Sequence, residues 1–159
     1  MSRSIFSQLL LALLFSGTQA QAASNEADAR KMLEKAVEYY QQHGYEKGLE
    51  ECNRLDGPFN AKSEINQGDL YLFTLTYDGV SPCHGKNPKL RGKSMINLKD
   101  QNGVEFIKLM VEQCKAKGDG HVDYVWPHPE TKALMKKRSF TIRIPGKEEC
   151  LGAGISLPG

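Results

Sequence analysis

The stretch from Gly68 to Gly154 constrains the fold more than any other part of the chain. Its residue patterns follow the order strand, tight turn, short strand, amphipathic helix, aromatic strand and two further strands. This order predicts one small domain that mixes α-helices with β-strands. No nucleophile–base pair, carboxylate dyad or phosphate-binding glycine motif stands out, so the sequence favours binding over catalysis.

The first strand of this stretch runs from Leu70 to Tyr77, and both of its faces are apolar or β-branched. Such a strand is expected to be covered on both sides. Asp78-Gly79 then predicts a hairpin turn into a short strand that ends near His84. Pro82 within that strand favours the edge of a sheet, because proline has no N–H to donate.

The helix and the later strands are also periodic. Asn102 with Glu105 resembles a capping box, and Gly118 predicts the end of the helix. Its apolar stripe consists of Val104, Ile107, Val111 and Cys114. The three strands that follow have shared faces formed by Val122, Tyr124 and Trp126, by Phe140, Ile142 and Ile144, and by Leu151, Ala153, Ile155 and Leu157. Gly152 and Gly154 on the other side of the last strand leave room for a helix or a small ligand.

A long amphipathic helix is expected at residues 25–43, ahead of this stretch. Asn25 followed by Asp28 is a capping signal, apolar residues recur at helical spacing, and Gly44 marks the end. We interpret this element as a packing helix.

Residues 1–22 have the pattern of a cleavable signal peptide. Arg3 supplies a positive charge, Ile5 to Phe15 form a short apolar core, and Ala20-Gln21-Ala22 offers small residues for a signal peptidase. The core is too short to span a bilayer comfortably, which disfavours an uncleaved membrane anchor. We therefore expect a single soluble domain at residues 23–159, periplasmic or secreted, with no stable membrane insertion after cleavage.

The charge balance argues against a nucleic-acid partner. The formal net charge is +2, and loss of Arg3 with the signal leaves +1. The basic cluster Lys136-Lys137-Arg138 is isolated, whereas binding to a phosphate backbone needs a more extended basic patch.

All four cysteines lie in the exported part of the chain, where oxidising conditions favour two disulfides. They are Cys52, Cys83, Cys114 and Cys150. A zinc site is disfavoured because the cysteines are about thirty residues apart without a Cys-x-x-Cys pair. The adjacency of Cys83 and His84 does not indicate a catalytic dyad, since such partners must meet in space. Three pairings are possible.

Spaced motifs along nearly the whole exported part resemble a single Cache domain, and they occur in that family's order. They are Gly68-Asp69-Leu70-Tyr71-Leu72-Phe73, Asp78-Gly79, His84 with Asn87-Pro88-Lys89-Leu90-Arg91-Gly92-Lys93, Asp100 to Phe106, Val122-Asp123-Tyr124-Val125-Trp126-Pro127-His128-Pro129-Glu130-Thr131, Lys137 to Phe140, and Gly152-Ala153-Gly154-Ile155. The agreement of several spaced motifs makes the resemblance specific.

The resemblance implies an α+β, PAS-like fold. A five-stranded antiparallel sheet would have a long N-terminal helix on one face and a loop-helix excursion over the other, with a small-molecule pocket beneath the excursion. Family members usually form sensory parts of chemoreceptors or histidine kinases and often recognise small organic acids. This chain ends at Gly159 without a transmembrane helix or output domain. We therefore expect a stand-alone exported member that signals through a separate membrane receptor or kinase.

Two departures from the family pattern bear on the site. Cysteines replace apolar residues at four positions, and the family topology brings all four toward one end of the sheet, so proximity excludes little. Among the three pairings we prefer Cys52 with Cys83 and Cys114 with Cys150. Phe140 stands where a tyrosine is common, which removes one hydroxyl from the pocket.

The expected ligand site combines aromatic walls with a few polar groups. Phe73, Tyr124, Trp126 and Phe140 are the candidate walls, and Lys137 and His84 the candidate polar contacts. A carboxylate facing Lys137 would form a charge-assisted pair. No catalytic residue, metal or cofactor is expected. The alternatives are an aromatic core without a pocket and a protein-interaction module that keeps the fold without a ligand.

Overall fold

The computed structural model describes residues 23–128 and 131–158, and its N-terminal part contains two helices. Helix α1 spans Glu26–His43 and α2 spans Tyr45–Asn53. The side chain of Asn25 accepts hydrogen bonds from two amides of the first turn of α1, and Asp28 bonds back to the amide of Asn25. The predicted capping box is therefore present. Gly44, with φ 85°, ends α1 in a backbone conformation that favours glycine.

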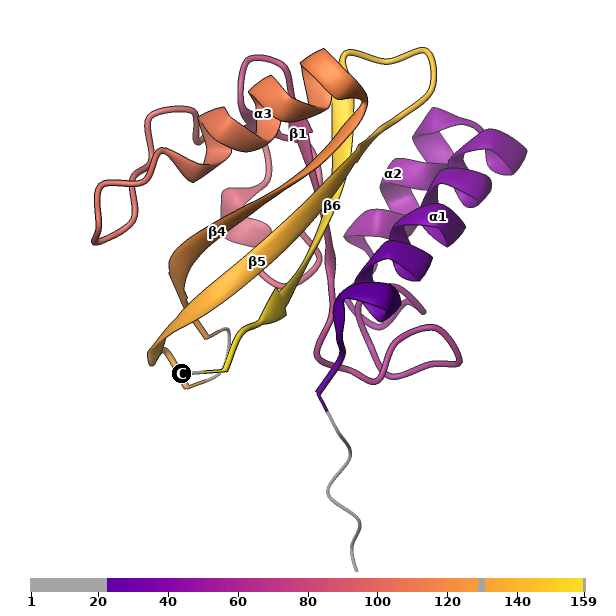
Figure 1. Ribbon diagram of the computed structural model, residues 1–159. Coiled ribbons are helices and arrows are strands. Elements are labelled where there is room, and N and C mark those ends of the chain that lie inside the picture. Colours follow the sequence, from indigo (N-terminus) through magenta and orange to yellow (C-terminus); the bar gives the residue numbers. More distant parts are fainter. Residues whose placement is uncertain (1–22, 129–130, 159) are drawn as a thin grey trace, which may run out of the picture.

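Four antiparallel strands form the main sheet in the order β1-β6-β5-β4. Their bounds are β1 Leu72–Thr76, β4 Asp119–Pro127, β5 Leu134–Arg143 and β6 Glu149–Ser156. Figure 1 shows α1 and α2 together on one face of this sheet and α3 on the other. The expected α+β class with an antiparallel sheet is confirmed.

The expected fifth strand is not a full member of this sheet. Strand β2, Val80–Ser81, pairs instead with β3, Lys93–Ser94, in a separate two-stranded sheet. The chain that follows β2 meets β1 in a single bridge between Phe73 and His84. The physical reason is local: Pro82 has no N–H, and the Cys83 amide donates to the Thr74 hydroxyl instead of a main-chain carbonyl.

Two helical segments lie on either side of β3 in the sequence and belong to the second face. A 3₁₀ turn spans Pro88–Leu90, and helix α3 spans Phe106–Lys117. The predicted capping box of Asn102 with Glu105 does not form, because Glu105 is the N-cap residue and makes no side-chain cap. The carboxylate of Asp100 instead accepts hydrogen bonds from the amides of Asn102 and Val104. Gly118 ends α3 in the left-handed conformation, as predicted.

The two faces of the sheet bury different sets of side chains. The α1 face, which packs against α1, has a cluster that includes Leu72, Phe140, Leu151 and Ala153 from the strands with Met32, Ala29 and Ala36 from α1. The α3 face, which packs against α3, has Tyr71, Phe73, Leu75, Phe106, Met110, Val122 and Tyr124. Strand β1 contributes to both faces, so the prediction of a strand covered on both sides is confirmed.

Two disulfides connect helices to later parts of the chain. Cys52 at the end of α2 is bonded to Cys83, and Cys114 in α3 is bonded to Cys150 in β6. The bonds close stretches with sequence separations of 31 and 36 residues. The preferred pairing is confirmed.

The predicted signal peptide, residues 1–22, lies outside the described residues. Within residues 23–128 and 131–158, no helix is both long and apolar enough to span a bilayer.

Candidate functional site

A cavity of about 450 Å³ opens on the α3 face, between the end of β4 and the segment that contains the 3₁₀ turn. Its lining residues are Tyr71, His84, Lys86, Asn87, Lys89, Leu90, Trp126, Pro127, His128 and Lys132. Aromatic and aliphatic surface alternates with lysines here, and none of the described lining residues is a carboxylate. The cavity therefore has an apolar body and a positive electrostatic bias, which suits a small anion.

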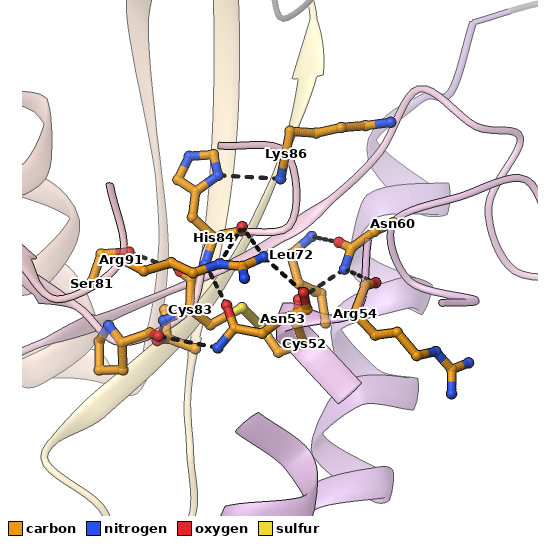
Figure 2. The surroundings of a disulfide bond; sticks show 12 residues. Cys52, Asn53, Arg54, Asn60, Leu72, Ser81, Cys83, His84, Lys86 and Arg91 are labelled. Carbon is orange, nitrogen blue, oxygen red and sulfur yellow. Dashed lines mark hydrogen bonds between the residues drawn. A yellow bond between two sulfur atoms is a disulfide. The ribbon is translucent and has the colours of Figure 1, made fainter. Parts of the chain in front are cut away.

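His84 is held as a neutral hydrogen-bond donor in the cavity wall. Its Nδ1 accepts hydrogen bonds from the amide of Lys86 at 3.3 Å (Figure 2) and from the amide of Asn87 at 3.1 Å. The ring hydrogen is therefore on Nε2. The ring stacks on Tyr71 with centroids 5.2 Å apart. Burial, reinforced by the charges of Lys137 and Arg91, lowers the pKa of His84 to about 4. The imidazole is therefore uncharged at neutral pH.

Lys137 is a buried cation one hydrogen bond away from the cavity. The side chain projects from β5 beside Tyr124, its partner on β4, and the residue is only 3% exposed. Its Nζ donates to the Tyr71 hydroxyl at 3.2 Å and lies 4.7 Å from the centre of that ring. Desolvation lowers the pKa of Lys137, partly opposed by Tyr124 and Asp69. Among the described residues, no carboxylate forms an ion pair with this ammonium group.

Tyr71 connects Lys137 to the cavity. Burial raises the pKa of its phenol to about 12, so the hydroxyl keeps its proton at neutral pH. Because this oxygen accepts from Lys137, its own proton is available for a further acceptor. A ligand oxygen in the cavity could thus receive a hydrogen bond that is strengthened by the ammonium behind it.

An aromatic group closes one side of the site. Phe106 of α3 stacks face to face on Tyr124 at 4.4 Å and meets Trp126 edge-on at 5.4 Å. Trp126 lines the cavity, whereas Tyr124 lies behind it with its hydroxyl hydrogen-bonded to Ser139 at 2.8 Å. Phe73 is also buried behind the wall. Its ring fills the space above Gly152, where an added methyl group would collide with it, so this glycine accommodates a side chain of the core.

Phe140 does not belong to this site, which corrects the expectation from sequence. It lies in the α1 face cluster, with the Arg30 guanidinium 4.7 Å from its ring centre. Side chains alternate along a strand, so residues three apart on β5, such as Lys137 and Phe140, point to opposite faces.

The structure thus brings five of the six expected residues to one face of the sheet. His84 and Trp126 line the cavity, while Lys137, Tyr124 and Phe73 lie directly behind its wall. Sequence reasoning missed Tyr71 as a contact, although the two-residue alternation of a strand puts it on the same face as Phe73. It also missed the loop lysines Lys86 and Lys89, for which periodicity gives no signal.

The side chains at the cavity include neither a free thiol nor a described metal site. All four cysteines are in disulfides, so none supplies a thiolate. Within the described ranges, no group of three or more His, Cys, Asp or Glu side chains is placed to hold a metal ion. What converges on the cavity is a set of hydrogen-bond donors and positive charges.

Comparison with known proteins gives one family match. Residues 36–157 match the model of the Cache domain. Similar solved structures include a Cache chemosensory domain studied for carboxylic acid recognition (TM-score 0.66, 23% identity, 83% of this chain and 92% of that one). A methyl-accepting chemotaxis protein of Vibrio parahaemolyticus is also similar (TM-score 0.64, 22% identity, 82% of this chain and 86% of that one). So is the periplasmic sensor domain of a chemotaxis protein (TM-score 0.62, 22% identity, 84% of this chain and 90% of that one). At these identities the structural likeness concerns the fold.

Proposed function

Since this chain belongs to the Cache domain family, we propose that it is a sensor-type binding protein whose cavity takes a small organic acid. The proposal assigns the protein no catalytic activity. Its ligand would lie on the α3 face, against Trp126 and Leu90, with its carboxylate toward Tyr71 and His84.

The observation that supports this proposal most strongly is the lone buried ammonium of Lys137. Taking a charge out of water is costly unless an opposite charge compensates it. Among the described residues, the hydroxyl of Tyr71 is the hydrogen-bond acceptor of Lys137, and no carboxylate forms an ion pair with it. A ligand carboxylate that accepts a hydrogen bond from the Tyr71 hydroxyl would place a negative charge near this ammonium in a site of low dielectric constant, where the attraction is strong.

Two further features favour an anion. The Nε2–H of His84 is a neutral donor, so it adds a hydrogen bond without a charge of its own. Lys86 and Lys89 at the cavity opening raise the local concentration of anions and speed their association.

We extend the proposal to the cellular context of the protein. Residues 1–22 would direct export, and the bound state would be recognised by a separate membrane receptor or histidine kinase. Two disulfides suit an oxidising compartment such as the periplasm. The similar structures include a periplasmic sensor domain of a chemotaxis protein and a domain that recognises carboxylic acids, which supports the same choice.

A thermal-shift screen of matched acids and amides tests the proposal. Acetate, propionate, lactate and succinate would each be compared with the corresponding neutral amide. A ligand that binds only the folded state adds about 2.7 kcal/mol of stability at a hundred times its Kd. At least one acid should raise the melting temperature while its amide does not. Unchanged melting temperatures for all organic acids would favour the protein-interaction alternative instead.

A further inference from the structure

The three residues Pro82, Cys83 and His84 are fixed from the end of helix α2. Cys83 is covalently bonded to Cys52 in the last turn of that helix. The side chain of the next helical residue, Asn53, bonds on both sides of this cysteine. Its Nδ2 donates to the Pro82 carbonyl at 3.2 Å, and its Oδ1 accepts from the His84 amide at 3.3 Å.

Arg91 fastens the same two segments together. Its Nη2 donates to the Asn53 carbonyl at 2.7 Å and to the His84 carbonyl at 3.1 Å, and its Nε donates to the His84 carbonyl at 3.2 Å. Figure 2 shows Asn53 and Arg91 converging on the main chain of His84, while the imidazole points away from them. We call the Cys52–Cys83 bond, Asn53 and Arg91 together the α2 clamp.

With the α2 clamp in place, one polar atom of His84 remains without a hydrogen-bond partner within the protein that the structure describes. The amide donates to Asn53, the carbonyl accepts from Arg91, and Nδ1 accepts from Lys86 and Asn87. Among the polar atoms of His84, only Nε2 has no hydrogen-bond partner in the part of the chain that the structure describes. His84 is 6% exposed and lines the cavity.

We propose that the α2 clamp positions His84 so that its Nε2–H is a fixed donor to the ligand, with Asn53 and Arg91 acting as positioning residues. This inference rests on the proposed function of the cavity. A preorganised donor costs less conformational entropy on binding than a free side chain does, so loosening the clamp weakens binding without changing any charge in the site.

The second disulfide provides a matched control. Cys114–Cys150 closes a stretch of similar length but joins α3 to β6, away from His84. Loss of either bond should therefore lower the melting temperature by a similar amount, because the entropy of the unfolded chain depends on the length of the closed loop. Only loss of Cys52–Cys83 should change the site.

The test compares the double variants Cys52→Ala/Cys83→Ala and Cys114→Ala/Cys150→Ala, and the single variant Asn53→Ala, which leaves both bonds intact. Imidazole nitrogen NMR of the free protein reports the tautomer and the pKa of His84, and acetate titration reports affinity. For Asn53→Ala and the first double variant, we expect mixed tautomers, a pKa of His84 closer to its ordinary value, and about tenfold weaker acetate binding. The Cys114→Ala/Cys150→Ala protein should retain the wild-type tautomer and affinity.

An unchanged tautomer and pKa of His84 in Asn53→Ala would overturn the inference, and so would equal changes in both double variants. The NMR measurement needs no ligand. Failure of every organic acid to bind the wild-type protein would therefore contradict the proposed function, whereas a His84 tautomer indifferent to the clamp would contradict the positioning role.

Discussion

The two faces of the sheet are built from the same four strands, yet they differ in what they bury. The α1 face is packed mainly with apolar side chains such as Phe140 and Leu151, and the carboxylate that it buries, Glu149, accepts a hydrogen bond from the Tyr45 hydroxyl of α2. The α3 face buries Lys137, Ser139 and His84 among its aromatic rings and opens into the cavity. The comparison supports the proposal that the α1 face supplies stability, whereas the α3 face gives up stability for binding.

Strand β5 shows this division at the level of single residues. Phe140 points to the α1 face, while its neighbour Ser139 and Lys137 point to the α3 face. Period-two alternation allows one strand to serve both purposes, because a substitution at an odd-numbered position leaves the opposite face unchanged.

The largest effect is expected for Phe140→Ala. Removing a fully buried ring leaves a cavity in the α1 face and should cost about 3–5 kcal/mol of unfolding free energy. Urea unfolding measures this loss. The control variant is Trp126→Ala, which removes an aromatic side chain of similar kind from the half-buried wall of the cavity. Phe140→Ala should keep its affinity for the organic acid, and Trp126→Ala should lose affinity with a smaller loss of stability. A loss of affinity in Phe140→Ala together with unchanged affinity in Trp126→Ala would contradict the division of roles between the two faces.

The next largest effect is a pH dependence that belongs to His84. Its pKa is lowered from 6.5 in the unfolded chain to about 4 in the fold, so the unfolded state binds the proton first as the pH falls. Stability should therefore decline by about 3 kcal/mol between pH 6.5 and pH 4, and be unaffected by this group above pH 6.5. In His84→Gln, urea unfolding across this window should show a flatter profile. An identical slope in the variant would assign the loss to other groups.

The smallest stability effect, and the one of opposite sign, is expected for Lys137→Met. Methionine has a similar length and no charge to desolvate, so the variant should be more stable than the wild type by about 1 kcal/mol at neutral pH. Urea unfolding checks the sign. A loss of stability as large as that of Phe140→Ala would show that Lys137 is part of the structural core.

The sequence predicted those features that are set by local chemistry or by a repeating pattern. The capping box of Asn25 and Asp28, the glycine ends of α1 and α3, and the residues sharing each strand face are of this kind. The resemblance to the Cache family predicted the antiparallel topology. The structure confirms the preferred disulfide pairing.

The site predictions from sequence were wrong or incomplete where residue patterns of separate strands and loops had to be combined. Phe140 was assigned to the pocket with Lys137 because the family resemblance places a tyrosine at that position, although their spacing along β5 puts the two residues on opposite faces. Before α3, the amide hydrogen bonds are accepted by the side chain of Asp100 and not by that of Asn102, because a short carboxylate can also bond to nearby main-chain amides. The contacts from Lys86 and Asn87 depend on the path of a loop, which no periodicity specifies.

The most direct test of the account uses Trp126, which is the only tryptophan of the chain and lies in the cavity wall. Its fluorescence would be followed while organic acids and their amides are titrated into the wild type and into Lys137→Met. We predict a saturable change with at least one acid, no change with its amide, and loss of the response in Lys137→Met. An emission that no acid alters, or a response of equal strength in Lys137→Met, would contradict the central claim that a buried cation on the α3 face recognises an organic anion.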